Sequence, residues 1–75
     1  MNFDKELDAK GLSCPLPILR TKKSLSDMSS GQILKIISTD KGSILDIPAF
    51  AHQTGNILLS SDQENETFIF FMQKK

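Results

Sequence analysis

The sequence contains one cysteine and one histidine, so a chain of 75 residues has to fold without an internal disulfide or a four-ligand structural zinc site. A domain of this size hides only about 60% of the surface that its unfolded chain exposes, so its stability depends on one compact, regular core. Hydrophobic residues make up 39% of the sequence, which is enough for one such core. Because separate cores form only in much longer chains, we expect one domain over residues 1–75.

The charges of the sequence balance, with nine lysines and arginines against nine aspartates and glutamates. A chain without net charge has no overall field that attracts nucleic acid or an anionic membrane. The longest apolar run, Phe68–Met72, is far shorter than the roughly 20 residues of a membrane helix. The first ten residues include acidic residues where a secretory signal would be basic and then apolar. We therefore expect a cytoplasmic protein that does not insert into a membrane and whose cysteine stays reduced.

The spacing of apolar residues predicts four strands and two helices. Alternating apolar and polar positions indicate strands, and apolar positions three to four residues apart indicate helices. The expected strands are Phe3–Asp8, Gln32–Thr39, Asn56–Ser61 and Thr67–Met72. The polar residues 62–66 between the last two strands are typical of a hairpin with a longer loop.

A proline pair marks the start of the first helix. Pro15 suits the first helical position because its missing N–H has no partner there, which places Cys14 at the N-cap. Apolar positions from Ile18 to Met28 form a helical stripe, and Gly31 is expected just beyond the end of the helix.

The second helix has two possible starts, Ser43 and Asp46, which are both good N-cap residues. Pro48 would remove an interior hydrogen bond in the first case and is harmless near the start in the second. We therefore predict a loose turn from Ser43 and a regular helix over Asp46–Thr54, ended by Gly55.

The resulting order, βαβαββ, predicts an α/β fold. Strand–helix–strand crossovers make consecutive strands parallel and put both helices on one face, and the final hairpin adds an antiparallel pair. We therefore expect a two-layer α/β sandwich with a four-stranded mixed sheet and both helices on one face. The other face would carry Ile33, Ile37, Ile69 and Phe71, either as a partner surface or as an ordinary apolar exterior.

The segment with the most chemical information is Leu12–Pro17, in which Cys14 precedes two prolines. Cys14 lies where the first strand passes into the first helix, and ligands gather at this edge of open α/β sheets. A lone cysteine is usually a small buried hydrophobic residue, but a residue leading into Pro-x-Pro at a helix start lies on a rigid elbow at the surface. We therefore predict an exposed thiol whose geometry is fixed by Pro15 and Pro17.

The helix start also affects the acidity of this thiol. A helix N-terminus favours the thiolate, but by only about 0.3 to 1 kcal/mol, less than the roughly 1.4 kcal/mol of one pKa unit. Pro15 and Pro17 have no N–H, so two of the usual donors to an anion are missing. We expect a moderately acidic thiol that is inert alone and reacts when it is docked on a partner.

Two other cysteine chemistries are disfavoured. The chain has no second cysteine for dithiol exchange, and the only histidine, His52, is expected on the polar side of the second helix rather than beside Cys14. What remains for a lone exposed thiol is to take a group from one partner and give it to another.

Around these residues the sequence resembles the TusA/SirA-like family of sulfur carriers, and the resemblance covers nearly the whole chain. Its amino-terminal part is carried by Leu7-Asp8, Gly11-Leu12, Cys14-Pro15-x-Pro17 and the basic pair Lys22-Lys23. Its second part is carried by Gly31, the isoleucine-rich strand to Asp40, Asp46-Ile47-Pro48, Phe50 and Gly55. The sequence departs from the family pattern at Lys41, where many members have proline, and at Leu16, where some have an acidic residue.

The resemblance implies the same βαβαββ sandwich and a function as a persulfide carrier or sulfurtransferase. In that role Cys14 accepts sulfane sulfur from a donor such as a cysteine desulfurase and relays it to an acceptor protein, for tRNA thiolation, molybdenum-cofactor synthesis or another sulfur pathway. No cofactor or metal is required. Lys22, Asp40 and Asp46 are candidates for partner docking, although turn and cap roles are the more common explanation of the two aspartates.

Two further functions stay open. The chain could be a non-catalytic binding or regulatory module that uses the face of the sheet without helices and does not need the thiol. Direct binding to nucleic acid is disfavoured by the zero net charge and by the lack of a basic cluster beyond Arg20, Lys22 and Lys23.

Overall fold

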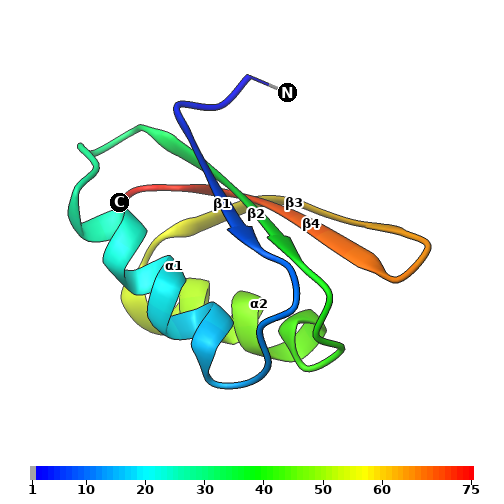
Figure 1. The fold of residues 1–75 in the computed structure, drawn as a ribbon. Helices are drawn as coiled ribbons and strands as arrows, with labels where there is room; N and C mark the ends of the chain where they lie inside the picture. The colour runs from blue at the N-terminus through cyan, green and yellow to red at the C-terminus, as the bar shows by residue number, and fades with distance from the viewer. Residues whose placement is uncertain (1) are drawn as a thin grey trace.

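A computed structural model describes residues 2–75, which form four strands and two helices in the predicted order (Figure 1). The strands are β1 (Lys5–Ala9), β2 (Ile33–Ser38), β3 (Ile57–Glu64) and β4 (Thr67–Gln73). The helices are α1 (Leu16–Ser26) and α2 (Ser43–Thr54). No helix in this part of the chain is long and apolar enough to cross a membrane.

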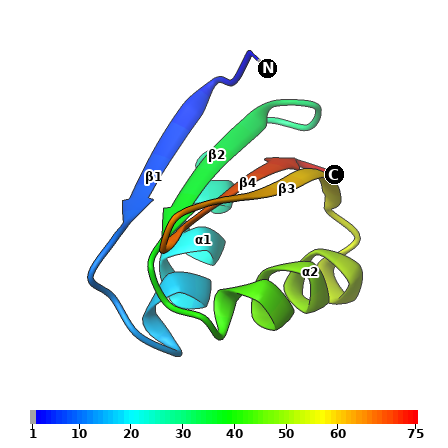
Figure 2. The same cartoon turned by 90° about the vertical axis from the view of Figure 1, so that its right-hand side faces the viewer.

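The four strands form one mixed sheet in the order β1-β2-β4-β3. β1 is parallel to β2, and β4 lies between β2 and β3, antiparallel to both. Both helices cover the same face of the sheet (Figures 1 and 2). The predicted two-layer α/β class is therefore confirmed. β2 and β3 run in the same direction, as expected of a crossover, but the last strand separates them.

The core lies between the sheet and the helices. It takes alternate residues of β2 and β4, among them Leu34, Ile36 and Phe70, because successive side chains of a strand point to opposite faces. From the helices it takes Leu25 and Ile47, which lie on their inward stripes.

The predicted start of α2 is wrong, because the helix begins at Ser43 and contains Pro48. Ser43 is buried, and its hydroxyl lies 2.7 Å from that of Ser38 at the end of β2. The backbone N–H of Asp46 donates to the Gly42 carbonyl at 2.9 Å, which closes the first turn. These contacts stabilise the early start despite the hydrogen bond that Pro48 cannot make. Gly55 ends the helix with a φ of 79°, as predicted.

The predicted bounds of α1 are also displaced. Its N-cap is Pro15 rather than Cys14, and its C-cap is Asp27, so the helix ends well before Gly31. Gly31 has a φ of 91° and instead forms part of the turn into β2, where its N–H donates to the Lys74 carbonyl at 2.8 Å.

The hairpin is tighter than the sequence predicts. β3 continues through Asp62 to Glu64, and only Asn65 and Glu66 connect it to β4. The polar side chains of the expected loop therefore belong to an edge strand, where they meet solvent on both faces. Asn65 supplies the positive φ of 58° that the short turn requires.

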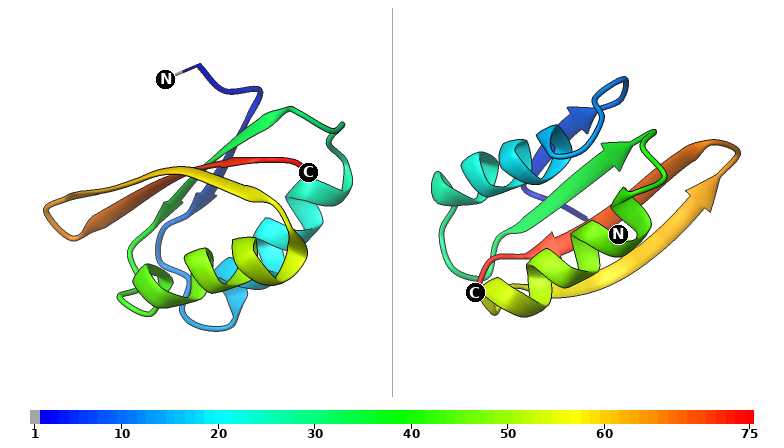
Figure 3. Two further views of the ribbon diagram at one scale, coloured as in Figure 1. Left: turned by 180° about the vertical axis from the view of Figure 1, so that it is seen from behind. Right: turned by 90° about the horizontal axis from the view of Figure 1, so that it is seen from below.

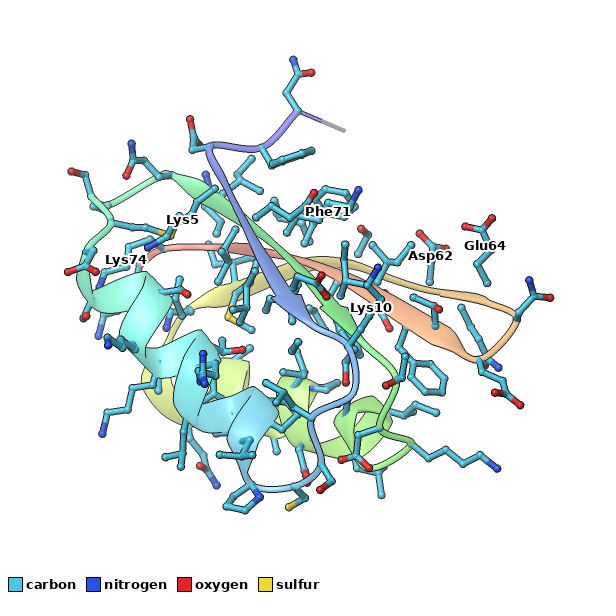
Figure 4. All side chains as sticks on the ribbon, viewed as in Figure 1. Lys5, Lys10, Asp62, Glu64, Phe71 and Lys74 are labelled. Carbon is cyan, nitrogen blue, oxygen red and sulfur yellow. The ribbon has the colours of Figure 1, made fainter. Side chains whose placement is uncertain are left out.

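The face of the sheet that carries no helix is called the uncovered face here. Phe71 lies on it, with Asp62 and Glu64 on the neighbouring edge strand (Figure 4). Phe3 precedes β1 rather than beginning it, and its ring lies 6.1 Å from that of Phe71 and 5.2 Å from Lys35 Nζ. The predicted apolar residues Ile33, Ile37, Ile69 and Phe71 are all half-buried.

Candidate functional site

Cys14 lies in the loop between β1 and α1, and its side chain is exposed, as the sequence predicts. The loop is short and held by its own backbone: the Leu12 N–H donates to the Ala9 carbonyl at 3.2 Å, and the Leu16 N–H donates to the Ser13 carbonyl at 2.9 Å. The peptide bond between Cys14 and Pro15 is cis. The thiol is thus presented at the surface by an ordered turn rather than by a free loop.

The two prolines of the motif occupy different environments. Pro15 is exposed at the start of α1, whereas Pro17 is buried in its first turn. The Thr21 hydroxyl, which is fully buried, donates to the Pro17 carbonyl at 2.8 Å. Pro17 therefore anchors the helix start in the core, and Pro15 forms the outer part of the elbow beside Cys14.

The loop between β2 and α2 lies next to the Cys14 loop and is fastened to it. The Gly11 N–H donates to the Thr39 hydroxyl at 2.9 Å across the two loops. The Ser38 hydroxyl, which pairs with Ser43, also accepts the Asp40 N–H at 3.2 Å. Sequence reasoning missed these hydroxyl contacts, because serines and threonines near turns occur in most sequences and carry no specific signal.

Two carboxylates reach the neighbourhood of the thiol from this second loop. A Cβ placed on Gly42 would lie 3.1 Å from Asp40 Oδ2 and 3.5 Å from Asp46 Oδ2, so both side chains face the same turn. The structure thus brings two of the predicted docking residues, Asp40 and Asp46, to the loops that hold Cys14.

These surroundings raise the pKa of the Cys14 thiol above its ordinary value. The largest cause is the loss of hydration around the sulfur beside neighbouring protein atoms. The negative charge of Asp46 comes next, followed by the hydrogen bond that its carboxylate accepts from the protonated thiol and by the negative charge of Asp40. The prediction that the Cys14 thiol is moderately acidic is therefore wrong. The helix end is a weak influence, and the aspartates that outweigh it lie more than 25 residues away in the sequence.

Beside Cys14 is an open cavity of about 300 Å³ between the two helices. Ile18 of α1 and Phe50 of α2 give it apolar walls, and Asp46 and Gln53 give it polar ones. Leu16 and Leu45, in the first turns of the two helices, are 41% and 76% exposed.

Lys22, the third predicted docking residue, lies elsewhere. It lines a second cavity, of about 340 Å³, together with Lys74 and Lys75 at the other end of the helix pair. The structure therefore does not bring Lys22 together with the two aspartates.

The histidine and the metal-ligating residue types do not gather around the thiol in the described residues 2–75. His52 is exposed and does not line the cavity that contains Cys14. Within residues 2–75, no three histidine, cysteine, aspartate or glutamate side chains form a group that could hold a metal ion.

The fold and the site define a class of small α/β proteins that present one thiol at the start of a helix. A family model described as Sulfurtransferase TusA matches residues 5–74. The sulfur carrier protein TusA of Allochromatium vinosum is 59% identical over 73 residues, which are 97% of this chain and 96% of that protein. The putative sulfur carrier protein YrkI of Bacillus subtilis is 47% identical over 74 residues, which are 99% of each chain.

The chain therefore belongs to the TusA sulfurtransferase family. The predicted family and, at the level of the family, the predicted role as a sulfur carrier or sulfurtransferase are confirmed. The crystal structure of a SirA-like protein from Desulfitobacterium hafniense matches with a TM-score of 0.82 and 21% identity, over 93% of this chain and 96% of that one. At this identity the likeness shows the fold alone, and the fold agrees with the sequence prediction.

Proposed function

We propose that Cys14 carries sulfane sulfur as a persulfide from a donor protein, such as a cysteine desulfurase, to an acceptor protein. The observation that supports this most directly is the exposure of the single thiol on an ordered loop, in a chain of the TusA family. A donor that arrives on another protein can reach only a sulfur atom at the surface.

The transfer needs no oxidant and no cofactor. The Cys14 thiolate attacks the outer sulfur of the donor persulfide, a new S–S bond forms, and the donor's S–S bond breaks. The electron pair of the broken bond leaves with the donor thiolate. In the second step a nucleophile of the acceptor attacks the outer sulfur on Cys14, whose sulfur leaves as the thiolate.

The raised pKa of Cys14 gives the free carrier a defined resting state. At neutral pH the raised pKa keeps most of the thiol protonated, and therefore weakly nucleophilic. A partner that places a cation beside Asp46 and Asp40 would offset their charge and favour the thiolate. Reactivity would then depend on docking, as expected from the sequence.

The pathway served by the relay is a further part of the proposal. Thiolation of tRNA, molybdenum-cofactor synthesis and other sulfur pathways each require a persulfide acceptor, and the cytoplasm provides the reducing conditions that keep Cys14 available. The exposed apolar Leu16 next to the thiol is part of the surface that an acceptor would have to match.

Persulfide formation on Cys14 tests this proposal directly. The protein is incubated with a cysteine desulfurase and cysteine, and its intact mass is measured before and after reduction. We expect the gain of one sulfur atom that a reductant removes. Cys14→Ser should show no gain and keep an unchanged circular dichroism spectrum, because the side chain is exposed and supports no core contact.

The same gain of sulfur on Cys14→Ser, or no gain on the unaltered protein with an active desulfurase, would contradict the proposal. A desulfurase that transfers sulfur to another family member in a parallel reaction is the matched control.

A further inference from the structure

Two neighbouring cavities lie between the helices, and together they are called the interhelical groove here. On α1 its wall follows Ile18, Lys22 and Leu25, and on α2 it follows Asp46, Phe50 and Thr54. These positions are three or four residues apart, so each set lies on one side of its helix. Phe50 lines both cavities, so they meet at its side chain. Figure 3 shows the two helices from the side away from the sheet (right).

The interhelical groove has opposite charges at its two ends. Asp46 lies at the end with Cys14, and Lys22, Lys74 and Lys75 lie at the other end, which is called the lysine end. No acidic side chain of the described residues 2–75 lines the cavity at the lysine end. Opposite charges at the two ends of one groove would fix the direction in which a charged segment binds.

The lysines of this end are not used within the fold as partners of carboxylates. The ion pairs found in residues 2–75 use the lysines at positions 5, 10 and 35. Lys74 Nζ donates to the Leu25 carbonyl at 2.8 Å, which fixes it beside the C-terminal end of α1 (Figure 4). Lys22 and Lys75 are exposed. Positive charge is therefore held in place at the lysine end and remains available to a ligand.

The length of the interhelical groove sets how many residues of an extended peptide can lie along it. Asp46 and Thr54 are about 12 Å apart along the axis of α2, at roughly 1.5 Å per residue. An extended chain advances about 3.3 Å per residue, so about four residues cover this distance.

We propose that the interhelical groove receives an extended segment of a partner protein, with a reactive cysteine at Cys14 and an acidic side chain about four residues away in the lysine end. The inference rests on the proposed function, since it describes how the donor or acceptor cysteine reaches the carrier. Phe50, in the middle of the groove, provides the apolar contact between the two charged ends. A nucleic acid is disfavoured, because Asp40 and Asp46 repel phosphates from the Cys14 end.

Thiol–disulfide exchange with short peptides tests the inference. Each probe is an extended pentapeptide whose cysteine is activated as a mixed disulfide with thionitrobenzoate. The Cys14 thiolate attacks the peptide sulfur, the S–S bond breaks, and coloured thionitrobenzoate leaves with the electron pair. Probes with aspartate or asparagine four residues from the cysteine, before it or after it, are compared at low ionic strength.

We expect one of the aspartate peptides to react roughly three to ten times faster than its asparagine counterpart. High salt should remove the difference, because it screens exposed charges. Lys22→Glu should also remove it. Lys23→Glu is the matched control, since this neighbouring lysine is exposed but does not line the cavity, and should preserve the difference.

Equal rates for aspartate and asparagine peptides would overturn the inference, and so would equal effects of Lys22→Glu and Lys23→Glu. Inhibition of the reaction by micromolar single-stranded RNA would assign the lysine end to nucleic acid and would overturn it too. The peptide experiment tests the groove separately from the proposed function, because thiol–disulfide exchange reports docking at Cys14 without forming a persulfide. If the protein accepts sulfur normally but the aspartate and asparagine peptides react at equal rates, the inference about the groove is rejected and the proposed function as a carrier is retained.

Discussion

At the scale of single residues, the reactivity of Cys14 is set by side chains that come from another loop. The sequence correctly predicts the exposure of the thiol, because a residue before Pro-x-Pro at a helix start has to lie at the surface. It does not predict the direction of the pKa shift. Parallel pairing of β1 with β2, which the sequence predicts, brings Asp40 and Asp46 to the same edge of the sheet as Cys14, but the spacing of residues does not give the distances of their carboxylates from the sulfur.

The first residue-scale prediction concerns Asp46. Asp46→Asn removes a negative charge near the sulfur, so we expect the pKa of Cys14 to fall towards its ordinary value. The thiolate fraction at neutral pH should then rise, and alkylation by iodoacetamide should become roughly two to ten times faster. The measurement is the alkylation rate across a range of pH values, in which the midpoint for Asp46→Asn should lie at lower pH.

Asp62→Asn is the control for this prediction, because it removes the same charge from the distant edge strand β3. A midpoint that shifts equally in both variants would show that the net charge, rather than the local carboxylate, controls Cys14.

At the scale of elements, several starts and ends are harder to predict than the types of the elements, although Gly55 ends α2 as predicted. The apolar spacing gives the type and order of all six elements correctly. The start of α2 is predicted too late because proline is disfavoured inside helices. The hydrogen bond between the buried hydroxyls of Ser38 and Ser43 stabilises the earlier start, and the position of Pro48 does not reveal it. The end of β3 is predicted too early because residues 62–64 are polar, whereas an edge strand does not need apolar residues to pair.

The buried hydroxyl pair supplies the prediction at this scale. Ser43→Ala leaves the Ser38 hydroxyl without its buried partner, so we expect the free energy of unfolding to fall by about 1 to 3 kcal/mol. The measurement is equilibrium unfolding in urea. Ser30→Ala, at an exposed turn position, should change it by less than about 0.5 kcal/mol. Equal losses for the two variants would show that the hydroxyl pair does not stabilise the start of α2.

At the scale of the whole molecule, the helices cover one face of the sheet. The other face meets solvent, apart from the part on which the Phe3 ring packs against Phe71. The sequence predicts this division from the alternation along β2 and β4. It does not predict the insertion of β4 between β2 and β3, because the order of strands depends on how the final hairpin pairs and not on the pattern of any one strand.

Two adjacent phenylalanines test the division. Phe70 is 1% exposed in the core, so Phe70→Ala should lower the free energy of unfolding by about 3 to 5 kcal/mol. Phe71 lies half-buried on the uncovered face, so Phe71→Ser should cost less and leave sulfur acceptance by Cys14 intact. Urea unfolding and the mass assay measure the two effects.

The same variant separates the carrier from a binding module that works through the uncovered face. Partner capture that survives Cys14→Ala and fails in Phe71→Ser would favour the binding module over the carrier. Loss of capture in Cys14→Ala alone would favour the carrier.

The central position of β4 also constrains how the molecule is made. The last of the six elements to be synthesised is the one that joins β2 to β3, so the earlier segments have no complete sheet to pack against while β4 is missing. Three core residues, Phe68, Phe70 and Met72, also lie on β4, so a nascent chain on the ribosome completes its core only after residues 67–73 have emerged.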